Sequence, residues 1–311
     1  MGAQTAKIAI LGGGAMGSVF AGLFAETGHE VTIVSRAGAH MDAIRANGLR
    51  LNGASGDRRV QVRALDTPPS EEFDLIILAT KATQVEAAVG SLAPMIGEAT
   101  SILAMQNGLG AADIVAGHVD AHRLAVGIAA AFGASVVSPG YAHHTGMGAI
   151  KIGAYRDMAD EKTAQIADLW CSASFKAEAV SDILTMQWEK LICNASFSAP
   201  CAITGLTVGE ALTDPALGSI CLQAGIETWE IARACGVPLT VTDPEAHVHA
   251  FAERVAAAKP SLLQDVEAGR PSEIDFINGA VPREAAKMGL KAPVNQTLSA
   301  IVKAIEAKRG A

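Results

Sequence analysis

Residues 7–17 read KIAILGGGAMG, and this stretch decides the fold of the first half of the chain. The β-forming run Lys7–Leu11 predicts a strand, and the pattern that follows predicts a helix over Met16–Thr27. Between them, Gly12, Gly14 and Gly17 form the pattern Gly-x-Gly-x-x-Gly. A strand, a glycine-rich turn and a helix in this order are typical of the unit that binds a dinucleotide.

Each glycine of the turn has a separate expected task. Gly12 permits the tight turn, Gly14 lets a pyrophosphate approach the backbone, and Gly17 lets the helix pack closely on the strand. The helix N-terminus directs free N–H groups at the phosphates. The alternative, in which the glycines only serve a sharp turn, is disfavoured by the strand and helix on either side. We therefore expect the whole loop to bind the cofactor: Gly12, Gly13, Gly14, Ala15, Met16 and Gly17.

The end of the second expected strand, Val31–Ser35, indicates which nucleotide binds. NAD-binding proteins usually carry Asp or Glu at this end to hold the ribose hydroxyls. Here the strand ends Ile33-Val34-Ser35-Arg36, with a hydroxyl and a guanidinium but no carboxylate. Arg36 can bind a 2′-phosphate through charge-assisted hydrogen bonds, and Ser35 can donate another. A solvated surface arginine is the alternative, but the missing acid and the arginine both favour NADPH.

The remaining pattern divides the chain near residue 181. Before it, short apolar strands alternate with helical segments, which predicts a mainly parallel sheet with helices on both faces. After it, strand patterns stop. We expect a Rossmann-type α/β domain over residues 1–181 and an all-α domain over residues 182–311, with the ligand in the cleft between them. The expected later helices are Ile183–Ser198, Val208–Leu212, Pro215–Cys235, Pro244–Ala258, Ile274–Met288 and Val294–Ala307.

Composition excludes several classes of partner. The chain has 311 residues and a formal net charge of −8, with no block of basic residues, which argues against a nucleic-acid partner. The apolar run Ile8–Ala25 contains too many glycines for a membrane span, so no membrane partner is expected. Histidine pairs lack acidic or cysteine partners at ligand spacing, so no metal is expected. The long apolar helices fit either a homodimer interface or the protein's own core. The odd number of cysteines without a CxxC pair favours reduced thiols in the cytoplasm: Cys171, Cys193, Cys201, Cys221 and Cys235.

A polar stripe interrupts an otherwise apolar helix at residues 187–200, which read QWEKLICNASFSAP. Lys190, Asn194 and Ser198 recur every four residues and so lie on one helix face. An ammonium can polarise a carbonyl and give its oxygen a proton as a nicotinamide cofactor supplies hydride. Asn194 and Ser198 can hydrogen-bond a polar substrate. Taken alone, the pattern is better explained by a lysine that extends from a buried helix to solvent and by an Asn194 that caps a turn.

Further polar residues favour the chemical interpretation. Asn107 follows a buried strand in AMQNGLG, and loops after such strands line the ligand crevice. Ser261 and Glu273 lie in the stretch from residue 261 to 281. A carboxylate near Lys190 would keep the amine charged and orient it.

With these motifs together, the chain resembles the ketopantoate reductases over nearly its whole length. The matching stretches are KIAILGGGAMGSVFA, LATKATQVEAA with Lys81, AMQNGLG with Asn107, QWEKLICNASF with Lys190 and Asn194, and SLLQDVEAGRPSEIDFINGAV with Ser261 and Glu273. The resemblance implies reduction of the 2-oxo acid ketopantoate to pantoate with NADPH, a step toward pantothenate and coenzyme A.

The resemblance also implies a role for each matching residue. Lys190 is the expected general acid, and Glu273 binds a substrate hydroxyl and helps to place the lysine. Asn107, Asn194 and Ser261 contact substrate or cofactor, while Lys81 lies on the nucleotide side. Asn107 and Glu273 are expected at both ligands.

One residue departs from the family pattern. Many members carry a second asparagine where this chain has Ser198, whose single hydroxyl offers fewer hydrogen bonds than an amide. The exact substrate therefore stays open. The first hypothesis is a reductase of ketopantoate, and the second is a reductase of another branched 2-oxo acid. The third hypothesis is a protein that binds NADPH without catalysis.

Overall fold

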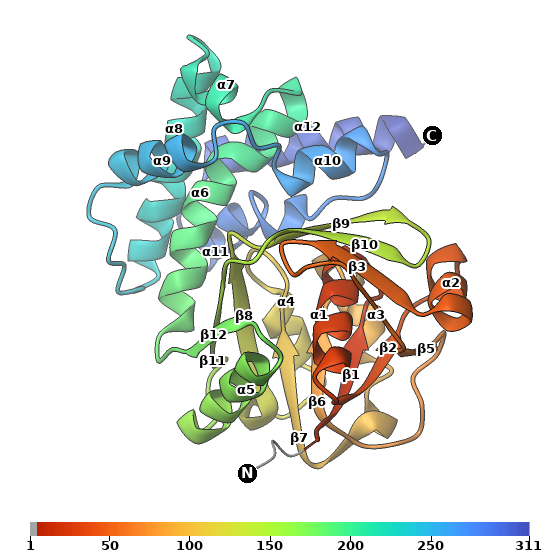
Figure 1. The fold of residues 1–311 in the computed structure, drawn as a ribbon. Coiled ribbons are helices and arrows are strands. Elements are labelled where there is room, and N and C mark those ends of the chain that lie inside the picture. Colours follow the sequence, from red (N-terminus) through yellow and green to blue (C-terminus); the bar gives the residue numbers. More distant parts are fainter. Residues whose placement is uncertain (1–4, 311) are drawn as a thin grey trace. The chain divides into compact units, whose positions relative to one another are not determined.

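The chain folds into two units, which the structure, a computed structural model, describes for residues 5–310 (Figure 1). The first unit contains the residues up to Gln106 together with Ala111–Ile183. The second contains Asn107–Gly110 and the chain from Leu184 onward. The short segment Asn107–Gly110 thus belongs to the second unit although the chain on both sides of it belongs to the first.

An eight-stranded sheet forms the base of the first unit. Its strands are β1 (Lys7–Leu11), β2 (Glu30–Val34), β5 (Arg63–Leu65), β6 (Phe73–Leu78), β7 (Ile96–Ala104), β8 (Leu124–Ala130), β11 (Ala149–Ala154) and β12 (Lys176–Ala179). They lie in the order β12-β11-β8-β7-β6-β1-β2-β5, and neighbours are parallel except β8 and β11. The strand order reverses between β1 and β6, which is where α/β sheets of this kind bind ligands.

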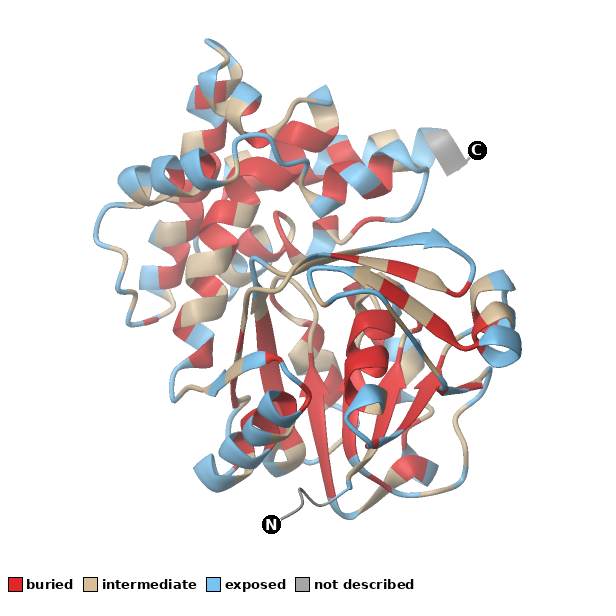
Figure 2. Ribbon diagram, viewed as in Figure 1, coloured by how far each residue is buried: buried red, intermediate tan, exposed pale blue. Residues whose placement is uncertain are grey.

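A second sheet of four strands covers one helix of this unit. It contains β3 (Leu49–Gly53), β4 (Arg58–Val60), β9 (Gly133–Ser138) and β10 (Tyr141–Gly146), in the order β4-β3-β10-β9. Helix α1 (Ala15–Glu26) packs against β1 and β2 on one side and against β3, β9 and β10 on the other. Every residue from Gly17 to Phe24 is therefore buried (Figure 2). This double cover explains why the helix is apolar on all faces.

Within its described residues, the first unit contains four further α-helices. They are α2 (Ala39–Asn47), α3 (Val85–Val89), α4 (Ala111–Ala116) and α5 (Asp160–Ser172), with one-turn 3-10 helices η1 (Ala82–Gln84), η2 (Ala93–Met95) and η3 (Ala121–Arg123). The α/β class predicted from the sequence is confirmed, with the small second sheet as an addition.

The second unit is helical throughout its described residues. Its elements are α6 (Ile183–Thr204, whose first residue belongs to the first unit), α7 (Val208–Thr213), α8 (Leu217–Ala234), α9 (Pro244–Arg254), α10 (Ser261–Glu267), η4 (Ile274–Phe276), α11 (Ala280–Lys287) and α12 (Pro293–Gly310). The single helix expected over Ile274–Met288 is wrong, because η4 and α11 are separate. Among the described residues, no helix combines the length and the apolarity that a bilayer crossing needs.

Candidate active site

The glycine-rich loop follows β1 and opens α1. Gly12 has a φ of 110°, a conformation that suits glycine, and its N–H donates to Val34 O at 2.9 Å. A Cβ on Gly17 would lie 1.9 Å from Gly12 O, so the helix can approach the loop only without a side chain there. A Cβ on Gly14, by contrast, would meet no atom within 4 Å. The loop therefore has the open face that a pyrophosphate requires.

The loop after β6 lies directly beside the glycine loop. A Cβ on Gly12 would lie 2.6 Å from Thr80 N. Gln106, two residues after the end of β7, fixes this neighbouring loop by donating from Nε2 to Leu78 O at 2.8 Å and to Thr80 O at 3.0 Å. Gln106 Oε1 and Thr80 Oγ1 are buried and make no hydrogen bond within the described chain. Because they lie in the loop beside the glycine-rich turn, these two atoms are placed to form hydrogen bonds with a bound cofactor.

The residues expected to select the nucleotide lie at the end of β2. Ser35 is partly buried, and its N–H donates to Leu65 O at 3.0 Å. Arg36 is exposed, and no carboxylate of the described residues pairs with it. Its guanidinium is therefore available for an anionic ligand. Lys81 follows β6 at the start of η1 and is partly buried.

The second unit brings three of the expected catalytic and substrate residues together. Lys190 on α6 donates from Nζ to Asn107 Oδ1 at 2.8 Å, although the two residues are 83 positions apart. Glu273 precedes η4, and its carboxylate acts electrostatically on the amine of Lys190. A lysine with an amide oxygen and a carboxylate near it is oriented rather than freely rotating.

Burial makes this lysine able to give up a proton near neutral pH. Removal from water lowers the pKa of Lys190 to about 8, because desolvation penalises the charged ammonium. The negative charge of Glu273 opposes part of that shift. An acid whose pKa lies close to the working pH is the kind that proton transfer favours.

The polar stripe on α6 is partly exposed only at its first two residues, Lys190 and Asn194. From Leu191 to Ala202 every residue is buried except Asn194, which is partly exposed next to the partly exposed Lys190. Ser198, one turn further on, is only 5% exposed. Ser261 is exposed as the first residue of α10, and within the part of the chain described here it makes no hydrogen bond to Lys190. The structure thus clusters Asn107, Lys190 and Glu273 but leaves Ser261 apart from their contacts.

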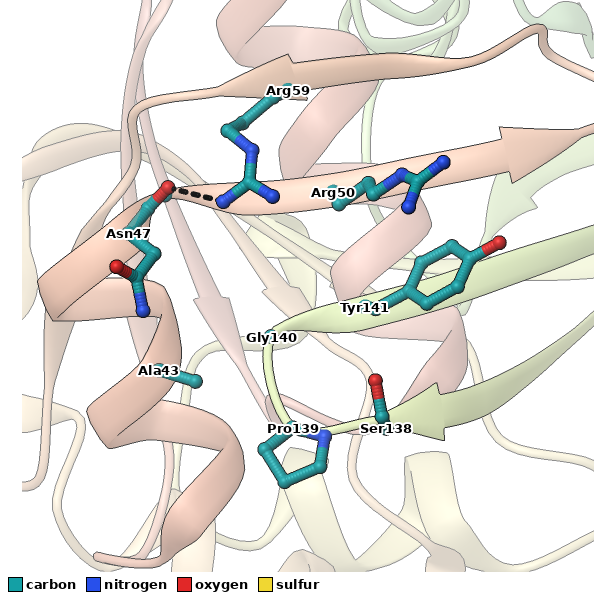
Figure 3. Close-up of a pocket in the computed structure, with 9 residues that line it drawn as sticks. Ala43, Asn47, Arg50, Arg59, Ser138, Pro139, Gly140 and Tyr141 are labelled. Atoms are coloured by element: carbon teal, nitrogen blue, oxygen red, sulfur yellow. Dashed lines mark hydrogen bonds between the residues drawn. The ribbon is translucent and has the colours of Figure 1, made fainter.

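A shallow pocket of about 320 Å³ in the first unit contains none of the expected site residues (Figure 3). It lies between the end of α2 and the small sheet. Two arginines line it, but both already have structural contacts. Arg59 donates to Asn47 O at 2.8 Å at the end of α2, and Arg50 pairs with Asp57 and lies over the Tyr141 ring. No group of three potential metal ligands occurs among the described residues.

Comparison with known proteins covers both units. The model of "Ketopantoate reductase PanE/ApbA" matches residues 8–157, and that of "Ketopantoate reductase PanE/ApbA C terminal" matches residues 182–306. The 2-dehydropantoate 2-reductase of Pyrococcus horikoshii is 31% identical over 304 residues, covering 98% of this chain and 99% of that protein. The enzyme of the same name from Streptococcus pyogenes serotype M1 is 30% identical and covers 96% and 97%.

Solved structures extend the similarity. A PanE/ApbA family ketopantoate reductase from Ralstonia eutropha is 30% identical, with a TM-score of 0.89 and coverage of 98% and 100%. A D-mandelate dehydrogenase in a ternary structure with NADH and anilino(oxo)acetate is 26% identical, with a TM-score of 0.90 and coverage of 98% and 99%. The resemblance predicted from the sequence is confirmed, and the chain belongs to the ketopantoate reductase family.

Proposed function

We propose that the protein reduces 2-dehydropantoate to pantoate with NADPH, a step toward pantothenate and coenzyme A. The 2.8 Å hydrogen bond from Lys190 Nζ to Asn107 Oδ1, beside the charge of Glu273, carries the proposal. A protein that only binds a nucleotide has no need for a partly buried amine held in this way. Membership of an oxidoreductase family supports the reaction class.

Lys190 is the proposed general acid. Bound NADPH would supply the hydride that reaches the carbonyl carbon. As negative charge develops on the carbonyl oxygen, the Lys190 ammonium donates its proton there, and the product leaves as the 2-hydroxy acid. Solvent then returns a proton to the neutral amine. A pKa of about 8 keeps most of the amine protonated at neutral pH while leaving the proton easy to transfer.

The neighbouring polar residues are assigned to substrate binding and orientation. Glu273 accepts a hydrogen bond from a substrate hydroxyl and holds the ammonium in place, while Asn107 orients it through the observed hydrogen bond. Asn194 and Ser261 hydrogen-bond the substrate or the cofactor. Ser198 limits the depth of the substrate pocket next to Asn194.

The first unit is assigned to NADPH. The open face at Gly14 and the close turn at Gly12 fit a pyrophosphate, and Arg36 with Ser35 fits a 2′-phosphate. Gly13, Ala15, Met16 and Gly17 complete the loop, and Lys81 contributes from the neighbouring loop. In this proposal residues 1–181 bind the nucleotide and residues 182–311 supply the acid.

A second 2-oxo acid is the alternative substrate. The similarity to D-mandelate dehydrogenase, together with Ser198 in place of an amide, favours a larger or differently branched acid. The D-mandelate dehydrogenase structure contains NADH, so the alternative substrate could be reduced with NADH in place of NADPH. A silent NADPH-binding protein is the remaining reading.

A panel of 2-oxo acids distinguishes these readings. Oxidation of NADPH and of NADH is followed by absorbance with 2-dehydropantoate, 2-oxo acids with other branches, and phenylglyoxylate. The proposal expects the highest kcat/KM with 2-dehydropantoate and NADPH. A higher value with another acid would move the assignment to the alternative. No turnover with any acid, while NADPH binds, would leave the silent binder.

Compartment and assembly are part of the same proposal. The cysteines are free thiols, three of them buried, which favours the reducing cytoplasm. A homodimer through the helical unit is proposed as the assembly, and light scattering after size exclusion tests it directly.

A further inference from the structure

One arginine outside the proposed chemistry joins the loops that carry Asn107 and Glu273. Arg283 lies on α11 and donates from Nη2 to Leu109 O at 2.8 Å and from Nη1 to Asp275 O at 3.0 Å. Leu109 is two residues after Asn107, and Asp275 is two residues after Glu273. A single guanidinium therefore connects the two loops through backbone carbonyls.

A direct backbone contact brings the same loops together. The N–H of Leu109 donates to Phe276 O at 2.9 Å. Gly108 has a φ of 78°, and a Cβ there would lie 1.8 Å from Phe276 O. A Cβ on Gly110 would lie 2.7 Å from Arg283 Nη2. The glycines thus let the Asn107 loop approach both Phe276 and the guanidinium without space for a side chain.

The planar guanidinium suits this position better than any other side chain. Its fixed fork of N–H groups can serve two separate carbonyls at once, whereas an ammonium acts as a single point charge. Its Nε faces Glu284 Oε1 at 3.4 Å, and Glu284 also pairs with Lys287 at 2.7 Å. The Glu284 carboxylate therefore contacts the Nε side of the guanidinium, while the two Nη groups donate to the loops.

We propose that Arg283 is a positioning residue for the reduction, because it fixes the separation of Asn107 and Glu273 around Lys190 by joining their loops. This inference rests on the proposed function, in which those residues act on the substrate. Within the described residues, none of the hydrogen bonds of Arg283 goes to Lys190, so its effect passes through the two loops.

Amide hydrogen exchange tests the connection without any need for turnover. In Arg283→Ala, segments 107–110 and 273–277 should exchange faster than in the wild type, while the buried part of α6 keeps its protection. Lys287→Ala is the matched control, because it removes a positive charge from the same helix and shares the partner Glu284. Unchanged exchange of both loops in folded Arg283→Ala would overturn the inference, whatever the enzyme reduces.

A double-mutant cycle tests whether the arginine acts through Glu273. Arg283→Ala should lower kcat/KM about tenfold in the wild-type background and less than about twofold in Glu273→Ala, since coupled residues are not additive. Equal losses in both backgrounds would indicate a purely structural role and overturn the proposal. If Arg283→Ala does not fold, Arg283→Lys goes through the same cycle and the same two outcomes apply.

The two experiments separate two kinds of failure. Faster exchange of the loops with no turnover of any 2-oxo acid would keep the structural connection and reject the proposed function. Turnover with unchanged exchange would keep the proposed function and reject the role of Arg283.

Discussion

The amine of Lys190 is partly removed from water, and this desolvation lowers its pKa. It is held by Asn107 Oδ1 and influenced by Glu273. Replacement by methionine keeps the length and the apolar stem but removes the proton. We expect Lys190→Met to lower kcat by about 10²–10⁴, the usual contribution of a general acid. Steady-state kinetics measure kcat, and a fluorescence titration measures NADPH binding, which should be retained. Loss of NADPH binding instead would show that the lysine serves the cofactor.

The lowered pKa of Lys190 predicts the pH dependence of the rate. The donor must be protonated, and its pKa is about 8. We therefore expect kcat/KM to be level around neutral pH and to fall as the pH rises through about 8. An ordinary lysine would keep the rate level for about two pH units more. A profile of kcat/KM against pH, recorded with the cofactor in excess, measures this fall. A rate that does not fall before about pH 10 would contradict the assignment.

Arg36 is the residue that should separate NADPH from NADH. A charge-assisted hydrogen bond contributes about 1.5–3 kcal/mol, which corresponds to about 10–150-fold in affinity. Arg36→Ala should weaken NADPH binding by that factor and change NADH binding less than about twofold. Arg59→Ala is the matched control, because this exposed arginine of the same unit instead contacts the end of α2. Equal weakening of both nucleotides by Arg36→Ala would reject the phosphate role.

Residue spacing predicts some of these neighbours and not others. Lys190 and Asn194 share a face because they are four apart on one helix. The contact between Lys190 and Asn107 spans 83 positions, so no local pattern contains it. Gln106 and Arg283 were missed for a further reason: both act on backbone carbonyls, which every residue has, and so their partners leave no trace in the sequence.

At the scale of elements, long periodic segments were predicted better than interrupted ones. The strands β1, β2 and β6 follow from apolar runs bounded by polar or glycine residues. After β6, the stretch from Ala82 to Gly90 forms no continuous helix but η1, the short helix α3 and a turn that begins at Gly90. The break at Ile277–Gly279 has a tertiary cause, because the buried Asn278 donates to Ala195 O and Asn295 Oδ1. Periodicity carries no information about such a distant acceptor.

The glycine-rich turn offers an element-scale test that separates binding from folding. Gly14 has a φ of −79°, which alanine adopts readily, and a Cβ there meets no protein atom within 4 Å. Gly14→Ala should therefore leave the free energy of unfolding within about 0.5 kcal/mol of the wild type. The added methyl should instead contact the cofactor and weaken NADPH binding by at least about fivefold, the low end of overpacking costs.

Gly17→Ala is the matched substitution in the same turn. Its Cβ would lie 1.9 Å from Gly12 O, so the chain itself must shift. We expect a loss of about 1–3 kcal/mol in stability together with the loss of binding. Chemical unfolding and NADPH titration distinguish the two variants. A destabilised Gly14→Ala, or a fully stable Gly17→Ala, would contradict the geometry of the loop.

At the scale of the whole molecule, each unit has its own apolar core, and this much follows from the pattern of the sequence. One core contains α1 with both sheets, and the other contains α6 with α8 and α12. The change from alternating strands to continuous helices marks the transition close to Ile183. The membership of Asn107–Gly110 in the second unit could not be predicted, because it depends on Phe276 and Arg283, which follow more than 160 positions later.

The core of the first unit also predicts how the molecule responds to acid. His144 on β10 is fully buried, with its ring 4.4 Å from that of Phe132. Burial lowers its pKa below the usual 6.5; the Gly146 backbone opposes part of this shift, and the electrostatic effects of His143 and Arg58 add to it. Burial also lowers the pKa of His29 and His40. As the pH falls, the unfolded chain therefore binds protons before the folded one does. The contribution of these histidines to the free energy of unfolding is fully present above about pH 6.5. It decreases as the pH falls toward their pKa values in the folded protein.

Replacement of one of these histidines should make that decrease smaller. His144→Leu removes a buried proton-binding group and suits the apolar surroundings, so its free energy of unfolding should fall less than that of the wild type between about pH 6.5 and 5. His122→Leu is the control, because His122 is exposed in the same unit, and its pH dependence should match the wild type. Urea unfolding followed by the fluorescence of Trp170, with Trp188 and Trp229 replaced by phenylalanine, reports on the first unit alone. A wild-type slope in His144→Leu would mean that the acid sensitivity arises elsewhere, with His29 and His40 as the next residues to replace.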